Sequence, residues 1–187
     1  ALEQRLQTAS SVQRWRPARL LRIERAPDHV RLHPDRNGTE AVIETRLLVA
    51  ADVSDSPIRK EFAIGVEQHD YAQTAIVCAA EVEMEHGGRA YERFTDSGPI
   101  ALLPLSGRRR GIVCTLDTAA AASALALDDQ ACAAMLQERF GRRLGRVLRV
   151  GARQPWPLRL LIAERVVDQR MVLIGNAAQT IHPIGAQ

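Results

Sequence analysis

The sequence predicts an α+β protein built mainly from antiparallel sheet. Short segments of alternating apolar and polar residues recur along the chain, separated by turn-forming pairs such as Asn37-Gly38, Gly87-Gly88 and Ser106-Gly107. This arrangement is typical of antiparallel strands joined by hairpins. Apolar residues recur at clear helical spacing in the segment from Asp128 to Phe140. No apolar run approaches the roughly eighteen residues of a membrane-spanning helix.

Residues 1–65 are predicted to form part of one domain that contains a small three-stranded meander. Residues 1–11 have weak helical spacing and are interpreted as the end of a helix. The expected strands are Ala18–Arg25, His29–His33 and Ala41–Ala50. The Asn37-Gly38 pair is a strong signal for a hairpin turn between the second and third strands. The third strand leads into a turn at Asp52.

Residues 66–167 are predicted to form a second domain, a mostly antiparallel sheet with helices on one face. The expected strands are Gln73–Met84, Ala90–Phe94, Ile100–Leu105, Arg110–Leu116, Leu144–Arg153 and Leu158–Ile162. The helix should begin at a cap on Asp128 or Asp129 and end at Gly141. We interpret the Ala-rich residues 118–126 as a loop or helix lead-in, and Pro155-Trp156-Pro157 as a rigid link.

Composition excludes several classes of function. The chain has 187 residues and a net charge of +3, with acidic residues interspersed among the arginines. This indicates a solvated surface and no nucleic-acid footprint, and Arg108-Arg109-Arg110 is interpreted as a surface turn. Cys78, Cys114 and Cys132 are widely spaced and lack a CxxC pair, so we expect no disulfide framework and no metal site. The expected location is the cytoplasm.

The segment 168–187 carries the most specific functional signal. Met171–Ile174 is predicted to be a buried strand, and Gly175-Asn176 ends it with residues that tolerate a sharp turn. Small residues follow, and then Pro183 and Gly185 form another bend. Such a backbone can approach a planar or phosphorylated ligand closely.

This segment resembles the second flavin-binding motif of the class A flavoprotein monooxygenases. Gly175-Asn176-Ala177-Ala178 followed by Ile181-His182-Pro183 is most similar to the ubiquinone-biosynthesis hydroxylases of the 2-polyprenyl-6-methoxyphenol type. The order Gly185-Ala186-Gln187 departs from the usual continuation of that motif.

Two further segments extend the resemblance to most of the chain from Leu47 onward. Residues 47–59 resemble the family's middle motif, in which Asp52, Ser56 and Arg59 match and Val53 replaces a glycine. A positive φ at Val53 would strain the backbone, and Asp52 could instead be a plain turn residue that caps a helix starting at residues 54–60. Residues 69–78 and 90–105 resemble paired strands of the family's substrate domain.

The resemblance implies FAD and NAD(P)H as cofactors and the hydroxylation of a polyprenylated phenol with O2 in ubiquinone biosynthesis. Because the cofactor carries this chemistry, no catalytic side chain and no metal ligand is assigned. The implied cofactor-binding residues are Asp52, Gly175, Asn176, Pro183, Gly185 and Gln187. The implied substrate residues are Arg93, Phe94 and His182. Further implied features are contact with other ubiquinone-biosynthesis proteins and a location peripheral to the inner membrane.

The family's dinucleotide-binding G-x-G-x-x-G unit is absent from the sequence. We therefore expect an interior fragment of a longer monooxygenase that is inactive by itself and binds flavin poorly. The alternatives are a class A monooxygenase that acts on a soluble aromatic compound, and a shorter flavin-free binding or scaffold module.

Overall fold

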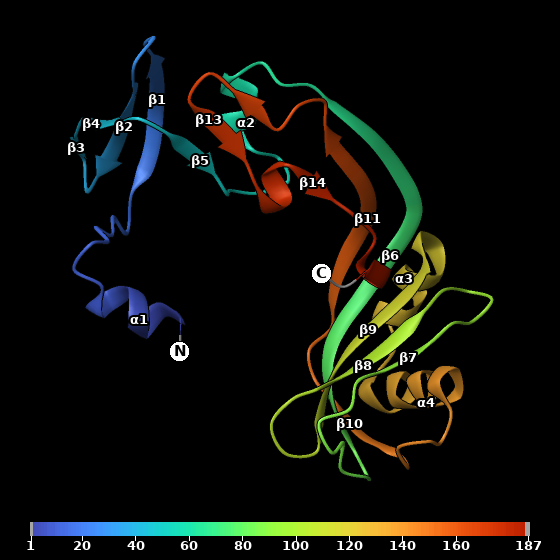
Figure 1. The fold of residues 1–187 in the computed structure, drawn as a ribbon. Helices are drawn as coiled ribbons and strands as arrows, with labels where there is room; N and C mark the ends of the chain where they lie inside the picture. The colour runs from blue at the N-terminus through green and yellow to red at the C-terminus, as the bar shows by residue number, and fades with distance from the viewer. Residues whose placement is uncertain (1, 186–187) are drawn as a thin grey trace. The chain divides into compact units, whose positions relative to one another are not determined.

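A computed structural model describes residues 2–185 and divides the chain into two compact units (Figure 1). The first unit combines the described residues up to Val66 with Ala163–Gln179, and the second combines Glu67–Ile162 with the residues from Thr180 onward. The described residues form three sheets of four, seven and three strands, together with short helices. The α+β prediction with mostly antiparallel pairing is therefore confirmed. The division at residues 179 and 180 splits the segment that was predicted to return as one piece.

The meander of the first unit follows helix α1 (Leu2–Thr8). Its strands are β1 (Arg19–Arg25), β2 (Val30–Arg36), β3 (Thr39–Glu40) and β4 (Ile43–Thr45). The predicted hairpin is present: Arg36 pairs with Thr39, and the two central residues, Asn37 and Gly38, have φ of 55° and 83°. Positive φ at both central positions is the reason for an Asn-Gly pair in this kind of turn.

The predicted third strand, Ala41–Ala50, is broken. Strand β4 pairs with β2, whereas β5 (Leu48–Ala50) leaves the meander and joins another sheet. The Thr45 hydroxyl donates to the carbonyl of Leu47 at 2.9 Å and accepts from its N–H at 3.4 Å. A side chain that bonds the backbone two residues onward competes with strand pairing, and the chain turns here.

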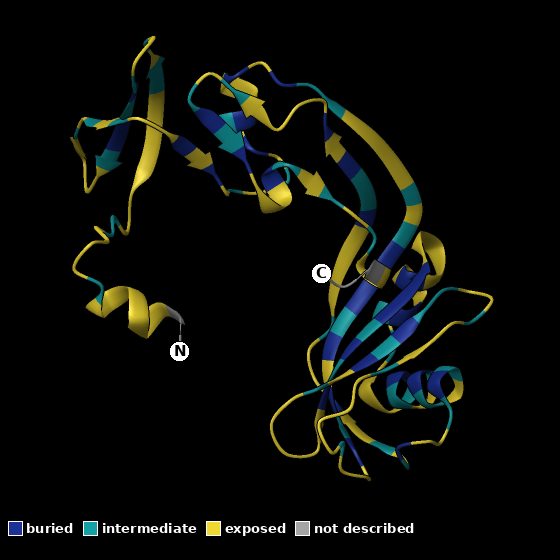
Figure 2. Ribbon diagram, in the orientation of Figure 1, coloured by how far each residue is buried: buried dark blue, intermediate teal, exposed yellow. Residues whose placement is uncertain are grey.

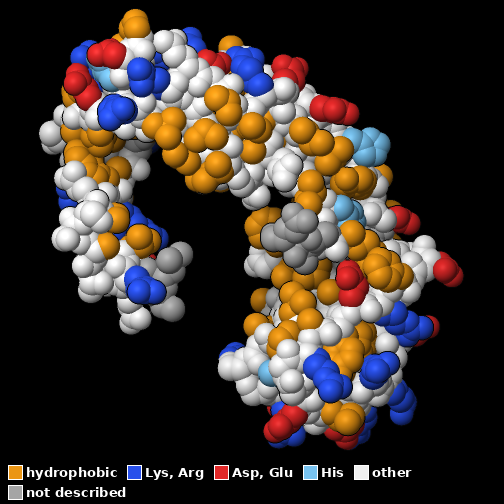
Figure 3. Space-filling model, viewed as in Figure 1, with side chains coloured by type: hydrophobic (Ala, Val, Ile, Leu, Met, Phe, Trp, Pro, Cys, Tyr) orange, Lys and Arg blue, Asp and Glu red, His pale blue; other side chains and the backbone are white. Residues whose placement is uncertain are grey.

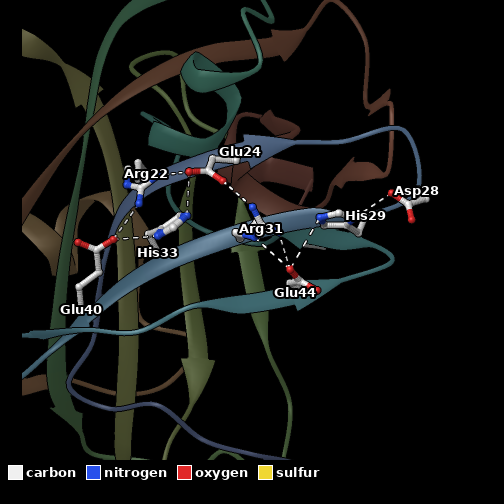
Figure 4. Close-up of polar contacts among 8 residues, drawn as sticks. All are labelled: Arg22, Glu24, Asp28, His29, Arg31, His33, Glu40 and Glu44. Atoms are coloured by element: carbon white, nitrogen blue, oxygen red, sulfur yellow. Dashed lines mark hydrogen bonds and ion pairs between the residues drawn. The ribbon is translucent and has the colours of Figure 1, made fainter.

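Charged side chains cover one side of the meander (Figure 4). Arg31 bonds Glu44 at 2.7 Å and Glu24 at 3.1 Å, and Arg22 bonds Glu40 at 3.0 Å. His33 is only 3% exposed, and its Nδ1 lies 2.8 Å from Glu40 Oε1. The pKa values of Glu24 and Glu44 are lowered first by their hydrogen bonds from Arg31, and that of Glu40 is lowered first by its hydrogen bond with His33.

A small mixed sheet completes the first unit, in the order β12 (Val167–Asp168), β13 (Met171–Leu173) and β5. The pair β13–β5 is parallel, with Met171 opposite Leu48 and Leu173 opposite Ala50. These residues are buried with Phe62, which directly follows helix α2 (Pro57–Glu61). The prediction of a buried strand at Met171–Ile174 is confirmed for its first three residues.

The second unit is built on the seven-stranded sheet, with the order β14-β11-β6-β9-β8-β7 and with β10 paired to β6. The strands are β6 (Val66–Val82), β7 (Tyr91–Arg93), β8 (Ile100–Pro104), β9 (Arg109–Asp117), β10 (Val147–Val150), β11 (Gln154–Ala163) and β14 (Gln179–Thr180). Helices α3 (Thr118–Leu125) and α4 (Asp129–Phe140) follow β9. The strands predicted for this region are present, with shifted ends.

Both ends of α4 are as predicted. The Asp128 carboxylate accepts from the N–H of Ala131 at 2.7 Å, and Gly141 has φ of 88° at the C-terminal end.

Residues 118–125, predicted as a loop or lead-in, form a helix of their own. Pro155-Trp156-Pro157 is part of β11 and not a link. A proline has no N–H to donate to a strand ladder, so these two residues contribute to the pairing of β11 only through their carbonyls.

One face of the seven-stranded sheet carries the larger hydrophobic core, visible as the buried stretches of Figure 2. Ile76, Cys114 and Ile100 are opposite one another on adjacent strands and pack with Leu136 and Phe140 of α4. All three cysteines are free and buried, as expected for core residues. Burial raises the pKa of Cys78 to about 11.

The interpretation of Arg108-Arg109-Arg110 as a surface turn is wrong for its last member. Arg110 lies opposite Ala80 and is fully buried. Its Nη1 donates to the carbonyl of Arg89 at 3.3 Å, whereas Nε and Nη2 have no hydrogen-bond partner among the described residues. Burial lowers the pKa of Arg110. Strand alternation, which turns each second residue to the core, outweighs the preference of a charge for water here.

Within residues 2–185, no helix is long and apolar enough to span a membrane. The same residues contain no group of three or more His, Cys, Asp or Glu side chains arranged to hold a metal ion.

Candidate flavin-binding site

The predicted cofactor residues of the first unit meet at one edge of its mixed sheet. Strands β5 and β13 are parallel, and the N–H of Ile174 donates to the carbonyl of Ala50 at 2.9 Å. Asp52 follows the first strand and Gly175 follows the second. Because parallel strands end at the same edge, the sheet brings these two segments together. Ligands of α/β sheets bind outside the carboxyl ends of such strands.

Asp52 acts through Ser56. The Ser56 hydroxyl donates to both carboxylate oxygens of Asp52, at 2.7 and 2.8 Å, and accepts from the N–H of Arg59 at 2.9 Å. Ser56 is therefore the N-cap of α2, and it is fully buried. Asp52 therefore does not cap this helix itself. It holds the Ser56 hydroxyl, which is the capping group.

Arg59 joins the two motifs. Its side chain is buried, and it donates to the carbonyl of Ala177 from Nη1 and to that of Ser54 from Nη2, both at 2.8 Å. One guanidinium thus holds the loop after β5 and the loop after β13. The sequence identified Arg59 as a motif match without a role, because its partners are backbone carbonyls that no residue pattern reveals.

Val53 does not carry the strain that a positive φ would impose. The non-glycine residues with positive φ among those described are Asn37, Ala63, Ala72 and Arg170. Val53 has an ordinary backbone and a side chain 60% exposed. The replacement of the family's glycine therefore leaves this turn unstrained.

Gly175 and Asn176 begin a short 3-10 helix, Gly175–Ala177. Gly175 has φ of 57°, a conformation that favours glycine, and nothing lies within 4 Å of the position that a Cβ would occupy. Asn176 is exposed, and its side chain makes no hydrogen bond to another described residue. Ala177 is fully buried and anchors the turn. A ligand can therefore approach the backbone at Gly175, and the side-chain amide of Asn176 is available for hydrogen bonds.

A groove of about 440 Å³ borders this edge within the first unit. One side is formed by Asp52, Val53 and residues of α2, and the other by residues 19–23 of β1. The lining combines aliphatic side chains with Arg22 and Glu61. A groove of this size can receive part of a nucleotide cofactor.

The remaining cofactor residues lie in the second unit. Pro183–Gly185 forms a 3-10 turn, in which the N–H of Ile184 donates to Nδ1 of His182 at 3.2 Å. The His182 ring packs edge-to-face on Tyr71, with centroids 5.3 Å apart. Burial lowers the pKa of His182, against a smaller opposing effect of Glu92. Gln187 lies outside the described residues.

The predicted substrate residues Arg93 and Phe94 differ in position. Arg93 pairs with Ile100 and so lies on the helix-covered side of the sheet, with Nη1 near Gly141. Phe94 is 70% exposed just after β7. The uncovered face instead carries Val77, Val113, Ala101 and Glu92, which are opposite one another across four strands. Strand alternation could have identified this row from the sequence.

Comparison with known proteins identifies the family to which this fold and site belong. A family model described as FAD binding domain matches residues 2–187, and the chain belongs to this family. The prediction of FAD as cofactor is confirmed at this level.

Among curated proteins, the chain is 39% identical over 171 residues to ubiquinone hydroxylase UbiL of Rhodospirillum rubrum, covering 91% of this chain and 39% of that protein. It is 30% identical over 187 residues to 3-demethoxyubiquinol 3-hydroxylase of Escherichia coli, covering 100% of this chain and 47% of that protein. The predicted resemblance to ubiquinone-biosynthesis hydroxylases is confirmed. The chain spans less than half the length of these two relatives.

Solved structures support the fold. The p-nitrophenol 4-monooxygenase of Pseudomonas putida superposes with a TM-score of 0.70 at 16% identity, covering 90% of this chain and 43% of that one. The flavin-dependent halogenase CmlS superposes with a TM-score of 0.68 at 16% identity, covering 91% of this chain and 32% of that one. These likenesses concern the fold alone.

Proposed function

We propose that the protein carrying this chain is an FAD-dependent monooxygenase that hydroxylates the ring of a polyprenylated phenol in ubiquinone biosynthesis, using NAD(P)H and O2. The names of the relatives support the substrate class. The observation that carries the proposal is the edge where β5 and β13 end, with an open approach at Gly175 and a free amide on Asn176.

Within this proposal the bound flavin supplies the activation of dioxygen, and the chain supplies position and polarity. Asn176 would hold the ribityl chain by a hydrogen bond when the flavin is bound, and Arg59 and Asp52 fix the two loops beside it. The apolar members of the row on the uncovered face of the second unit, Val77, Val113 and Ala101, would receive the phenol and exclude water. No metal is involved.

His182 has a defined protonation state in this scheme. Its Nδ1 accepts the N–H of Ile184, so the neutral ring carries its proton on Nε2. The lowered pKa favours this neutral form. Nε2 can then donate a hydrogen bond to the phenol oxygen of the substrate.

The test compares two substitutions at Asn176 in the complete gene product. Asn176→Leu keeps the volume and removes both hydrogen-bonding groups, so we expect a loss of roughly 1–3 kcal/mol, about five- to 150-fold in FAD affinity. Asn176→Asp keeps an acceptor and should retain affinity within a few-fold. Flavin titration by fluorescence measures both. Wild-type affinity and hydroxylation in the Leu variant would overturn the role of this site.

Two alternatives are separated by further measurements. A monooxygenase for soluble aromatics would hydroxylate a phenol without a prenyl tail as well as one with a tail, whereas the proposed enzyme gains kcat/KM with tail length. A flavin-free binding module, expressed from the complete gene, would purify without FAD.

A prenylated substrate resides in lipid, so the proposed enzyme works from the cytoplasm at the surface of the inner membrane.

A further inference from the structure

Three loops gather at one end of the seven-stranded sheet of the second unit. They are residues 83–89 after β6, residues 105–109, which connect β8 to the first residue of β9, and residues 142–149, which end with the first three residues of β10. Backbone hydrogen bonds connect them. The N–H of Val82 donates to the carbonyl of Arg108 at 3.2 Å, and the N–H of Met84 donates to the carbonyl of Leu144 at 3.1 Å. We call these loops the arginine-rich end.

Hydrogen bonds of His86 fix the shape of this end. Its Nδ1 accepts from the N–H of Gly88 at 2.9 Å, and its Nε2 lies 2.6 Å from the carbonyl of Leu105. With Nδ1 as acceptor, Nε2 is the donor, and the neutral ring connects the first loop to the second. The loops therefore form one preformed surface.

The charge of this surface is strongly positive. Seven exposed arginines lie on it: Arg89, Arg108, Arg109, Arg142, Arg143, Arg146 and Arg149. The acidic residues of the same loops are Glu83 and Glu85, and Glu83 already pairs with Arg146 at 3.4 Å. These loops thus carry more positive charge than the whole chain, whose net charge is +3.

Exposed aliphatic side chains lie among these arginines. Met84 is 54% exposed, Leu105 41% and Leu148 44%. Figure 3 shows orange hydrophobic atoms beside blue basic ones near the end of the sheet where β10 lies. Arginines around exposed aliphatic side chains are the combination that binds the interface of an anionic bilayer. A surface for single-stranded nucleic acid would offer aromatic stacking platforms, and these loops contain no Phe, Tyr or Trp.

We propose that the arginine-rich end docks on the surface of an anionic lipid bilayer, with its arginines at the headgroups and Met84, Leu105 and Leu148 inserted at the acyl boundary. The proposal rests on the proposed function only in that a prenylated substrate would be met in such a bilayer. The surface itself is independent of the flavin-binding residues.

The first experiment measures binding to vesicles by sedimentation. The wild-type protein should bind vesicles of phosphatidylcholine mixed with phosphatidylglycerol, and bind phosphatidylcholine vesicles far more weakly. The triple variant Arg89→Gln, Arg108→Gln, Arg142→Gln alters side chains that make no hydrogen bond or ion pair with other described residues. At low salt it should bind the anionic vesicles roughly a hundredfold more weakly, at about one kcal/mol per arginine.

A matched control removes the same charge elsewhere. Arg5→Gln, Arg19→Gln, Arg46→Gln replaces three exposed arginines of the first unit, and this variant should bind anionic vesicles within a few-fold of wild type. A second variant, Met84→Ser with Leu148→Ser, tests insertion. It should lose roughly tenfold in binding, and the loss should persist at high salt, where the arginines are screened.

Several outcomes would overturn the proposal. Equal losses in the two arginine variants would show a nonspecific charge effect. Equal binding to neutral vesicles would remove the electrostatic basis. Tight binding of RNA that the Arg89/Arg108/Arg142 variant abolishes, without vesicle binding, would assign the surface to nucleic acid.

Hydroxylation of a phenol without a tail separates this proposal from the proposed function. The triple variant in the complete gene product should keep that activity at the wild-type rate. If neither protein hydroxylates but wild type binds vesicles and the variant does not, the proposed function fails and the docking surface stands.

Discussion

At the scale of single residues, Arg59 is the side chain on which the candidate site depends most. Its buried guanidinium donates to two carbonyls in two different loops, and its backbone N–H donates to the capping hydroxyl of Ser56. Asn176 makes no side-chain hydrogen bond to another described residue, and Asp52 is held by Ser56, so the position of each follows from Arg59, Ser56 and the strands before them. Arg59 thus supports the site from below, and the exposed side chain of Asn176 stays available to a ligand.

We predict that Arg59→Met destabilises the protein. The carbonyls of Ala177 and Ser54 would lose charged donors in a buried position, at a cost of roughly 1.5–3 kcal/mol for each hydrogen bond. Urea denaturation measures the loss. Lys60→Met on the exposed neighbour, which pairs with Asp55 at 2.7 Å, should change stability little. A similar effect of both substitutions would show that Arg59 contributes only helix propensity.

Arg110 leads to the opposite prediction. Its guanidinium is fully buried with two nitrogens lacking partners among the described residues, and a buried charge without a partner costs free energy. Arg110→Met keeps most of the volume and removes the charge, so we expect a higher melting temperature. The exposed Arg108→Met is the control and should leave it unchanged. A lower melting temperature in Arg110→Met would mean that the bond to the Arg89 carbonyl outweighs the burial.

At the scale of elements, the meander is stabilised by its charged face as much as by its core. Hydrogen bonds from Arg31 lower the pKa values of Glu24 and Glu44 below the ordinary value of 4.5. A carboxylate with a lowered pKa in the folded state contributes stability above its unfolded pKa. That contribution disappears as the pH falls through the lower, folded value.

We therefore predict that the contribution of Glu24 and Glu44 to the stability of the meander is present above about pH 4.5 and is lost as the pH falls below it. Arg31→Met should flatten this acid limb, because the carboxylates lose the partner that lowers their pKa. Urea denaturation across this pH range measures the slope. Arg46→Met, on an exposed arginine nearby in the sequence, should leave the limb intact. An unchanged slope in Arg31→Met would assign the acid loss to other carboxylates.

The elements that the sequence predicted well are those fixed by local chemistry. The Asn37-Gly38 hairpin and the α4 caps at Asp128 and Gly141 were all predictable. Each depends on the φ that the residue itself adopts or on a hydrogen bond to a residue close by in the sequence. The break of the third strand was not, since it depends on β5 finding a parallel partner more than a hundred residues later. Such pairing has no signature within a short window.

The candidate site shows the same limit. Motif resemblance gave Asp52, Gly175 and Asn176, and the structure brings them to one edge. It also predicted Arg93 as a substrate residue, whereas strand register turns Arg93 toward the helix-covered face. Register depends on partners far along the chain, so the identity of a strand does not by itself fix the face on which a residue lies, and the substrate role of Arg93 stays a prediction.

At the scale of the whole molecule, the two compact units have separate hydrophobic cores. Phe62 and Met171 belong to the core of the first unit, and Leu136 and Ile100 to that of the second, with no buried residue in common. The stability of each unit should therefore respond mainly to substitutions in its own core. Chains with several such units depart from two-state unfolding.

Hydrogen exchange followed by mass spectrometry tests this last prediction. Phe62→Ala, at a side chain 1% exposed, should cost roughly 3–5 kcal/mol and raise exchange in peptides from β5 and β13. Leu136→Ala, at 2% exposed, should cost roughly 2–5 kcal/mol and raise exchange in β8, β9 and α4. Each variant serves as the control for the other. If either substitution accelerated exchange equally in both units, the two cores would unfold as one cooperative body, and the edge where β5 and β13 end could not open without the seven-stranded sheet.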